Sequence, residues 1–107
     1  MIKKFGVMKA LDLTVEQWTR MAEDPELDKF NAKASICKEN GLLDVHRCFL
    51  CQQSGENCKG CPVTIMTGVN CCHHNRYYFS NDREAGLSAA LAIRHYYPRC
   101  KRSGKPL

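Results

Sequence analysis

The sequence has no long hydrophobic run. None of its 107 residues lies in a stretch approaching the roughly 18 apolar residues that a membrane-spanning helix needs. The first residues include two lysines, but Lys9, Asp12 and Glu16 interrupt the apolar residues before a region of secretion-signal length develops. We therefore expect a cytoplasmic protein with no membrane partner.

Acidic residues are missing from the C-terminal end. The net charge is +5, and residues 1–40 balance seven basic against seven acidic side chains. The last fourteen residues hold five cations and no acid: Arg94, Arg99, Lys101, Arg102 and Lys105. Such a tail can bind phosphates or an acidic partner, or it can be a solvated chain end. Its last residues, KRSGKPL, contain no aromatic side chain to stack on a base.

The motifs of several enzyme classes are absent. The sequence has no Walker loop, no dinucleotide-binding glycine motif and no serine-hydrolase motif. CCHHN superficially resembles the histidine-rich centre of ββα-metal nucleases, but their Asp-His pairing is missing. We therefore expect a non-catalytic protein, and the catalytic alternative is a metal-dependent nuclease that uses His73 and His74.

Cysteine, in contrast, is concentrated in one segment. Six of the eight cysteines lie in CFLCQQSGENCKGCPVTIMTGVNCCHH, residues 48–74. Clustered cysteines in a reducing cytosol are more typical of metal ligands or catalytic thiols than of disulfides. Four of them form two C-x2-C pairs: Cys48 with Cys51, and Cys58 with Cys61.

The spacing of these pairs predicts a zinc site. Two intervening residues let one tight turn aim both thiolates at one ion, and two pairs complete a tetrahedron. A structural zinc is worth roughly 10 to 16 kcal/mol, whereas a small core rarely supplies more than roughly 3 to 5 kcal/mol. The alternative cofactor is an iron–sulfur cluster, because Pro62 follows Cys61 as in ferredoxin motifs.

Four further metal-binding side chains follow in one run: Cys71, Cys72, His73 and His74. Adjacent side chains diverge and seldom bind one ion together, so one cysteine of this run is an alternate fourth ligand of the first site. A second zinc, using one cysteine and one histidine of the run, would need Cys37 or Cys100. Otherwise the histidines occupy a surface turn, Cys37 is a buried thiol and Cys100 is an exposed one.

Hydrophobic periodicity predicts a small, mainly α, metal-stabilised fold, with residues 1–107 as a single domain. Two N-terminal helices are expected within residues 15–40. A capping box that begins at Thr14 starts the first helix. Asp24 suits the N-cap of the second helix, which Gly41 ends.

The rest of the chain is expected to be a loop-rich centre and one helix. Residues 42–80 show no helical or alternating period of useful length, apart from a single turn after Pro62, so we expect a zinc-binding loop region over residues 46–80. A long C-terminal helix is expected over residues 82–97, because Asn81 suits its N-cap and Pro98 cannot continue it. Residues 98–107 then form the basic tail.

Residues 13–77 carry a recognisable order of motifs: LTVEQW, then C-x2-C, C-x2-C-P and T-G-x3-C. In this order the chain resembles a family of small cysteine-rich proteins borne by phages and prophages. The matching positions are Trp18, Cys48, Cys51, Cys58, Cys61, Pro62, Thr67, Gly68, Cys72 and Tyr77. The family's next motif, Thr-Pro, is Asn75-Arg76 here.

The resemblance implies a phage origin and metal binding, and it makes Cys72 a contender for a ligand position. It assigns no biochemical role. We therefore expect a binding module that acts on a host protein, such as a transcription or defence factor, in the bacterial host cytoplasm. The alternative is a nucleic-acid-binding zinc protein that uses the basic C-terminal tail.

Overall fold

The computed structural model describes residues 5–45, 48–55, 58–67 and 82–106, and all regular structure within these ranges is helical. The elements are α1 (Val7–Glu23), α2 (Lys29–Asn40), α3 (Phe49–Gln53), the 3-10 turn η1 (Cys58–Gly60), α4 (Pro62–Thr67) and α7 (Arg83–Ser103). The prediction of a small, mainly α protein is therefore confirmed. None of the helices in these ranges combines the length and the apolar character that crossing a bilayer requires.

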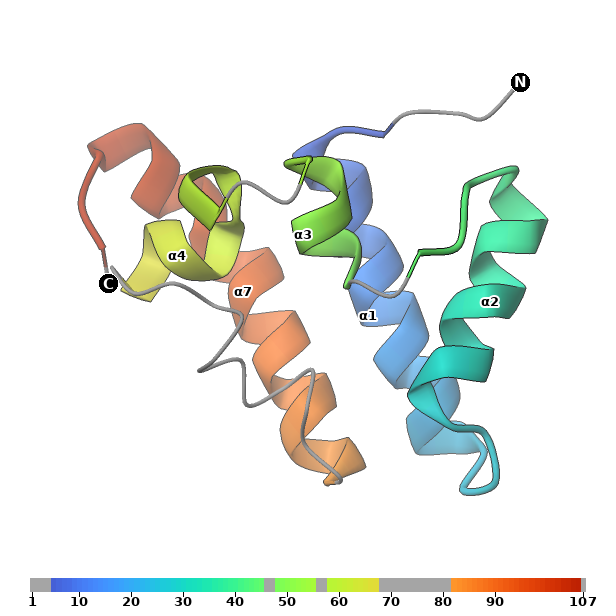
Figure 1. Ribbon diagram of the computed structural model, residues 1–107. Helices are drawn as coiled ribbons and strands as arrows, with labels where there is room; N and C mark the ends of the chain where they lie inside the picture. Colours follow the sequence, from blue (N-terminus) through green and yellow to red (C-terminus); the bar gives the residue numbers. More distant parts are fainter. Residues whose placement is uncertain (1–4, 46–47, 56–57, 68–81, 107) are drawn as a thin grey trace.

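Helix α1 occupies the centre of the fold, with α7 on one side, α2 on the other and α3 across its N-terminal half (Figure 1). Its buried side chains recur at helical spacing: Ala10, Leu11, Leu13, Thr14, Gln17, Trp18 and Met21. Arg94 of α7 pairs with Asp12 near the start of α1, and Arg83 bonds Met21 near its end. The two helices are therefore antiparallel.

The start of α1 differs from the prediction. The helix begins at Val7, two turns before the predicted capping box, and Thr14 is an interior residue. Its hydroxyl donates to the carbonyl of Ala10 at 2.7 Å, an alternative that threonine has inside a helix. The end at Glu23 follows from Pro25, which restricts Asp24 to an extended conformation.

The start of α2 is also later than predicted. Asp28, not Asp24, is the N-cap, and its carboxylate accepts a hydrogen bond from the backbone N–H of Asn31 at 2.8 Å. The carboxylate of Asp24 instead accepts from the N–H of Glu26 in the turn between the helices. The predicted end is confirmed, because Gly41 has the left-handed φ of 67° that glycine adopts without strain.

Two arginines form hydrogen bonds that connect α1, α2 and α7. The guanidinium of Arg20 on α1 donates to both carboxylate oxygens of Glu39 on α2 at 2.6 and 2.7 Å, which lowers the pKa of Glu39. Arg83 donates to the carbonyls of Met21 and Asp24 at 3.0 and 3.3 Å, and to that of Leu27. Arg83 therefore joins the first turn of α7 to the connection between α1 and α2.

The central segment belongs to the main hydrophobic core. We expected a loop region over residues 46–80 with one helical turn after Pro62. That turn is α4, but the described part of the region also contains α3 and η1 and buries apolar side chains. Phe49 and Leu50 are fully buried, and Val63 and Met66 are buried as well. Because α3 packs on α1 and α4 packs on α7, apolar burial holds both short helices in place.

Helix α7 continues past its predicted end. It extends to Ser103, so neither the end at residue 97 nor a tail beginning at residue 98 is correct. Pro98 removes one backbone hydrogen bond, at a typical cost of about 3 kcal/mol. Tyr97 and Cys100 on either side of it are buried in the core, which offsets this cost. The helix ends where Gly104 takes a φ of 70°.

The beginning of α7 has an aspartate cap. Asp82 accepts hydrogen bonds from the backbone N–H groups of Glu84 and Ala85, both at 3.1 Å. Asn81, the predicted cap, lies outside the described residues. The long helix itself is confirmed, and its cap differs by one position.

The closest approach between α1 and α7 occurs at Gly86. The indole ring of Trp18 is fully buried against the backbone of α7 there, and a Cβ atom at position 86 would overlap its ring carbons. Glycine in a helix is normally unfavourable by about 1 kcal/mol relative to alanine. At this position the absence of a side chain is what lets the two long helices pack.

We expect Gly86→Ala to lower the free energy of unfolding by about 1 to 3 kcal/mol, because overpacking outweighs the gain in helix propensity. Urea denaturation followed by circular dichroism measures the change. Ser88→Ala, at an exposed position of the same helix, is the control and should change stability by less than about 0.5 kcal/mol. An unchanged or higher midpoint for Gly86→Ala would contradict the packing argument.

Candidate metal centre

The two C-x2-C pairs begin consecutive short helical elements. Cys48 is the N-cap residue of α3, and Cys51 lies inside this helix. Cys58 is the first residue of η1, and Cys61 directly precedes α4, whose first hydrogen bond runs from Ile65 N to Cys61 O at 3.0 Å. Each pair therefore lies on one helical turn, as the two-residue spacing predicts.

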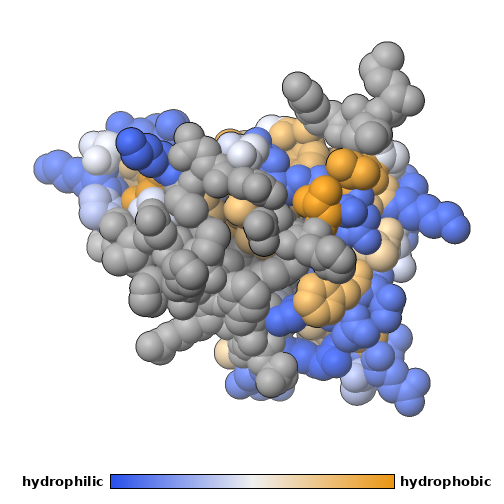
Figure 2. Space-filling model, in the orientation of Figure 1, coloured by the Kyte–Doolittle hydropathy of each residue, from blue (hydrophilic) through white to orange (hydrophobic). Residues whose placement is uncertain are grey.

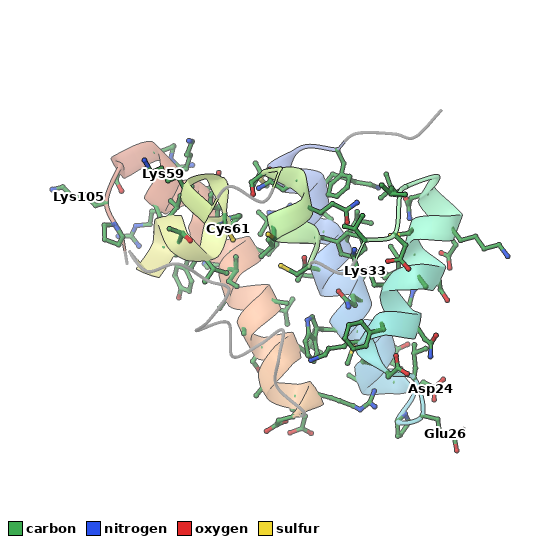
Figure 3. The ribbon with its side chains drawn as sticks, viewed as in Figure 1. Asp24, Glu26, Lys33, Lys59, Cys61 and Lys105 are labelled. Atoms are coloured by element: carbon green, nitrogen blue, oxygen red, sulfur yellow. The ribbon has the colours of Figure 1, made fainter. Side chains whose placement is uncertain are left out.

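Three of the four cysteines of the predicted site are buried. Cys48 and Cys51 are 5% exposed and Cys61 is fully buried where α4 meets α7 (Figure 3). Thiolate sulfur is the donor that zinc and iron–sulfur clusters both take, so the chemistry of this set fits a metal. In the part of the chain that is described, no three Cys, His, Asp or Glu side chains are grouped closely enough to share an ion.

The remaining predicted ligands lie outside the described side chains. The backbone of Cys58 belongs to η1, but its side chain is not described. Residues 71–74, with Cys71, Cys72, His73 and His74, also lie outside the described residues. Zinc binding, the fourth ligand, the second zinc and the nuclease alternative are therefore still predictions.

The elements that carry the two pairs, α3 and η1, contact each other. The side-chain amide of Gln53, at the end of α3, donates to the carbonyl of Gly60 in η1 at 3.1 Å. A Cβ at Gly60 would lie 3.2 Å from the Cβ of Ser54, tighter than an ordinary contact. The glycine in CKGC thus lets the element of the second pair approach that of the first.

The two isolated cysteines are both buried in the protein. Cys37 lies on the inner face of α2, and burial raises the pKa of its thiol, as expected for a small buried hydrophobic residue. The expectation that Cys100 is an exposed thiol is wrong. Because α7 continues through Pro98, Cys100 is only 4% exposed and faces the core.

Sequence reasoning missed a buried lysine beside the first pair. The side chain of Lys33 is 2% exposed and extends from α2 toward α3 (Figure 3). Its ammonium donates to the carbonyl of Val45 at 2.7 Å and to the side-chain oxygen of Gln52 at 2.8 Å. It also lies 5.1 Å from the ring centre of Phe49. One cation therefore joins α2, the segment before the first pair, and α3.

The charge of Lys33 is only partly balanced by its surroundings. Burial lowers the pKa of Lys33, and neighbouring groups, among them the Asp44 carboxylate, act against that shift. The carboxylate of Asp44 is 3.6 Å from the ammonium but half exposed, so it only partly compensates the buried charge. The one signal in the sequence for this position is that residue 33 lies one helical turn before Cys37, which we expected to be buried.

The predicted basic residues divide into two groups. Arg94 is engaged within the protein, since its guanidinium Nε lies 2.7 Å from Asp12 of α1. The other four are exposed, in the last turns of α7 or just after it: Arg99, Lys101, Arg102 and Lys105. These four are therefore on or beside a helix and not on the extended tail that we expected.

Comparison of the chain with protein-family models, with curated proteins and with solved structures finds no match.

We expect Lys33→Met to lower the free energy of unfolding by about 2 kcal/mol. The substitution removes a buried charge but leaves the oxygens of Val45 and Gln52 without their donor, and the second effect is the larger. Chemical denaturation measures it, with Lys38→Met at an exposed position of α2 as the matched control. If Lys33→Met is as stable as the wild type, desolvation of the charge dominates and the bonding role is wrong.

Proposed function

We propose that this protein is a non-catalytic, zinc-stabilised binding module that acts on a host protein in a bacterial cytoplasm. Cys48, Cys51, Cys58 and Cys61 bind the zinc, and Cys72 is the alternate fourth ligand. The observation that carries the metal part is the position of the two C-x2-C pairs at the starts of adjacent helical turns, together with the burial of Cys48, Cys51 and Cys61. The phage-type role rests on the resemblance alone.

Zinc is favoured over an iron–sulfur cluster by the way each pair lies on a single turn. Two such turns present four thiolates to one ion without further structure. The ion does not stabilise the centre alone, because Phe49, Leu50, Val63 and Met66 already bury apolar surface there. Loss of the metal should therefore loosen α3 and α4 while α1, α2 and α7 retain their helical structure.

We expect the native mass of the protein to exceed the chain mass by one zinc, and Cys51→Ser to release the ion and lower the melting temperature. Native mass spectrometry and metal analysis measure this, and iron in place of zinc would favour the cluster. Cys100→Ser removes a buried thiol outside the set of Cys48, Cys51, Cys58, Cys61 and Cys72, and this variant should retain the zinc of the first site.

The fourth ligand is resolved by the same measurement. Cys58→Ser should release zinc and Cys72→Ser should not, and the reverse result would make Cys72 the ligand. A wild-type protein that is metal-free and folded, or whose circular dichroism and melting point are unchanged by a chelator, would falsify the metal centre.

A surface for the host protein is suggested by the seam between α1 and α7. Met8 lies one turn before Asp12 on α1, and Leu91 one turn before Arg94 on α7. Both apolar side chains are exposed, by 40% and 50%. Because the helices are antiparallel, these side chains flank the Asp12–Arg94 ion pair, an arrangement of apolar and charged groups that protein interfaces use.

Exposed apolar residues elsewhere provide a control for this surface. Figure 2 shows that apolar side chains reach the surface on the side of α1 and α2 in separate patches bordered by hydrophilic residues. Phe30 on α2 is 53% exposed, so its substitution tests whether any apolar surface suffices.

We expect the wild-type protein to capture a defined host protein from bacterial lysate, and Leu91→Ser to reduce this capture while Phe30→Ser retains it. Affinity purification with quantitative mass spectrometry measures the ratio. If no host protein is enriched, the binding-module proposal fails, whatever the metal content. Equal capture by both variants would exclude the α1–α7 seam as the surface.

A further inference from the structure

A hollow of about 310 Å³ lies at the C-terminal end of α7, on the side away from α2. Its lining comes from the last two turns of the helix and from the chain that follows: Tyr96, Arg99, Cys100, Ser103, Lys105 and Pro106. Of the proposed ligands of the first zinc, Cys48, Cys51 and Cys61 have described side chains, and none of these three lines the hollow.

The hollow exists because the chain reverses at Gly104. The N–H of Gly104 donates to the carbonyl of Cys100 at 2.9 Å, and its φ of 70° turns the chain back. The hydroxyl of Ser103 donates to the same carbonyl, and it accepts from the N–H of Lys105, both at 3.3 Å. These bonds hold Lys105 and Pro106 beside the last turns of α7. The last turns of the helix form one wall of the hollow, and Lys105 and Pro106 form the other.

The charge of the hollow favours an anion. Arg99 and Lys105 line it, both are exposed, and no Asp or Glu occurs anywhere after Glu84 in the sequence. Lys59 of η1 projects at the same end of the protein (Figure 3), where Figure 2 shows hydrophilic side chains. The C-terminus of a helix carries only about half a negative charge, which these cations outweigh.

One wall adds an aromatic surface. Tyr96 is 37% exposed and lies one turn before Cys100, so its ring and the ring of Pro106 belong to the same hollow as the two cations. The last residues of the chain, KRSGKPL, contain no aromatic side chain. Because α7 continues through Pro98, the structure brings Tyr96 to the cations that follow it.

We propose that this hollow binds a nucleotide unit of single-stranded nucleic acid. The guanidinium of Arg99 donates a pair of hydrogen bonds to the phosphate, Lys105 adds a point charge, and the base stacks on Tyr96. The volume is at the lower end of the range for small-ligand pockets and suits one nucleotide rather than a folded partner. An acidic peptide satisfies the cations but supplies no ring for Tyr96.

The test uses the full-length protein and a fluorescently labelled eight-nucleotide single-stranded DNA. Fluorescence anisotropy should detect binding at about 50 mM salt that weakens steeply by about 200 mM. Arg99→Ala should weaken binding by roughly tenfold and Tyr96→Leu by at least about fivefold. Lys38→Ala, an exposed cation on α2, should change it by less than about twofold, and circular dichroism checks that each variant is folded.

Competitors identify the chemistry and the source of the ligand. A nucleoside monophosphate should displace the DNA at a lower concentration than inorganic phosphate, because the base contributes. An oligonucleotide that binds far more tightly than the mononucleotide identifies nucleic acid, whereas equal affinities identify a free nucleotide at the same hollow. Both results support the nucleotide chemistry.

Three outcomes overturn the proposal. The first is no binding at low salt. The second is binding that Arg99→Ala and Tyr96→Leu leave unchanged, which would locate the contact elsewhere. The third is that inorganic phosphate or an oligoglutamate peptide displaces the DNA as effectively as the mononucleotide does. Tyr96 would then have no role in binding.

Discussion

The contact between Trp18 and the backbone at Gly86 sets the spacing on which the remaining structure depends. It allows α1 and α7 to pack closely, and each of these helices carries one of the short central helices, α3 on α1 and α4 on α7. The distance between the two cysteine pairs is therefore fixed by the packing of two helices that contain neither pair. In this fold, the packing of the core and the relative position of the elements that carry the two cysteine pairs are coupled through one tryptophan and one glycine.

The sequence was most informative where the determining interaction is local. Gly41 ends α2 because only glycine readily takes its left-handed conformation, and no distant residue changes that. It was least informative where a distant contact decides. Thr14 has the sequence environment of a cap, yet burial of the preceding turn makes it an interior residue. Pro98 has the character of a helix terminator, but the burial of Tyr97 and Cys100 outweighs it.

The same contrast between local and distant interactions applies to the candidate site. The C-x2-C spacing correctly indicated that each pair lies on a turn, because that spacing is a local property. Lys33 was not identified, since a lysine in a helix is usually exposed and its partners Val45 and Gln52 belong to segments whose positions only the fold determines. The basic residues at the C-terminus were identified from the sequence. Their position beside Tyr96 was not, because Pro98 was expected to end the helix that carries them.

Arg83 has a consequence for the order in which the protein folds. Its three carbonyl acceptors lie 56 to 62 residues earlier in the chain, so the loop that these bonds close is more than half the length of the sequence. Long-range closure is slow compared with the formation of a helical hairpin. On a ribosome, α1 and α2 emerge well before α7, and until then water must solvate the carbonyls of their connection. The α1–α2 hairpin thus forms early, but the hydrogen bonds from Arg83 stabilise its connection only after α7 has docked.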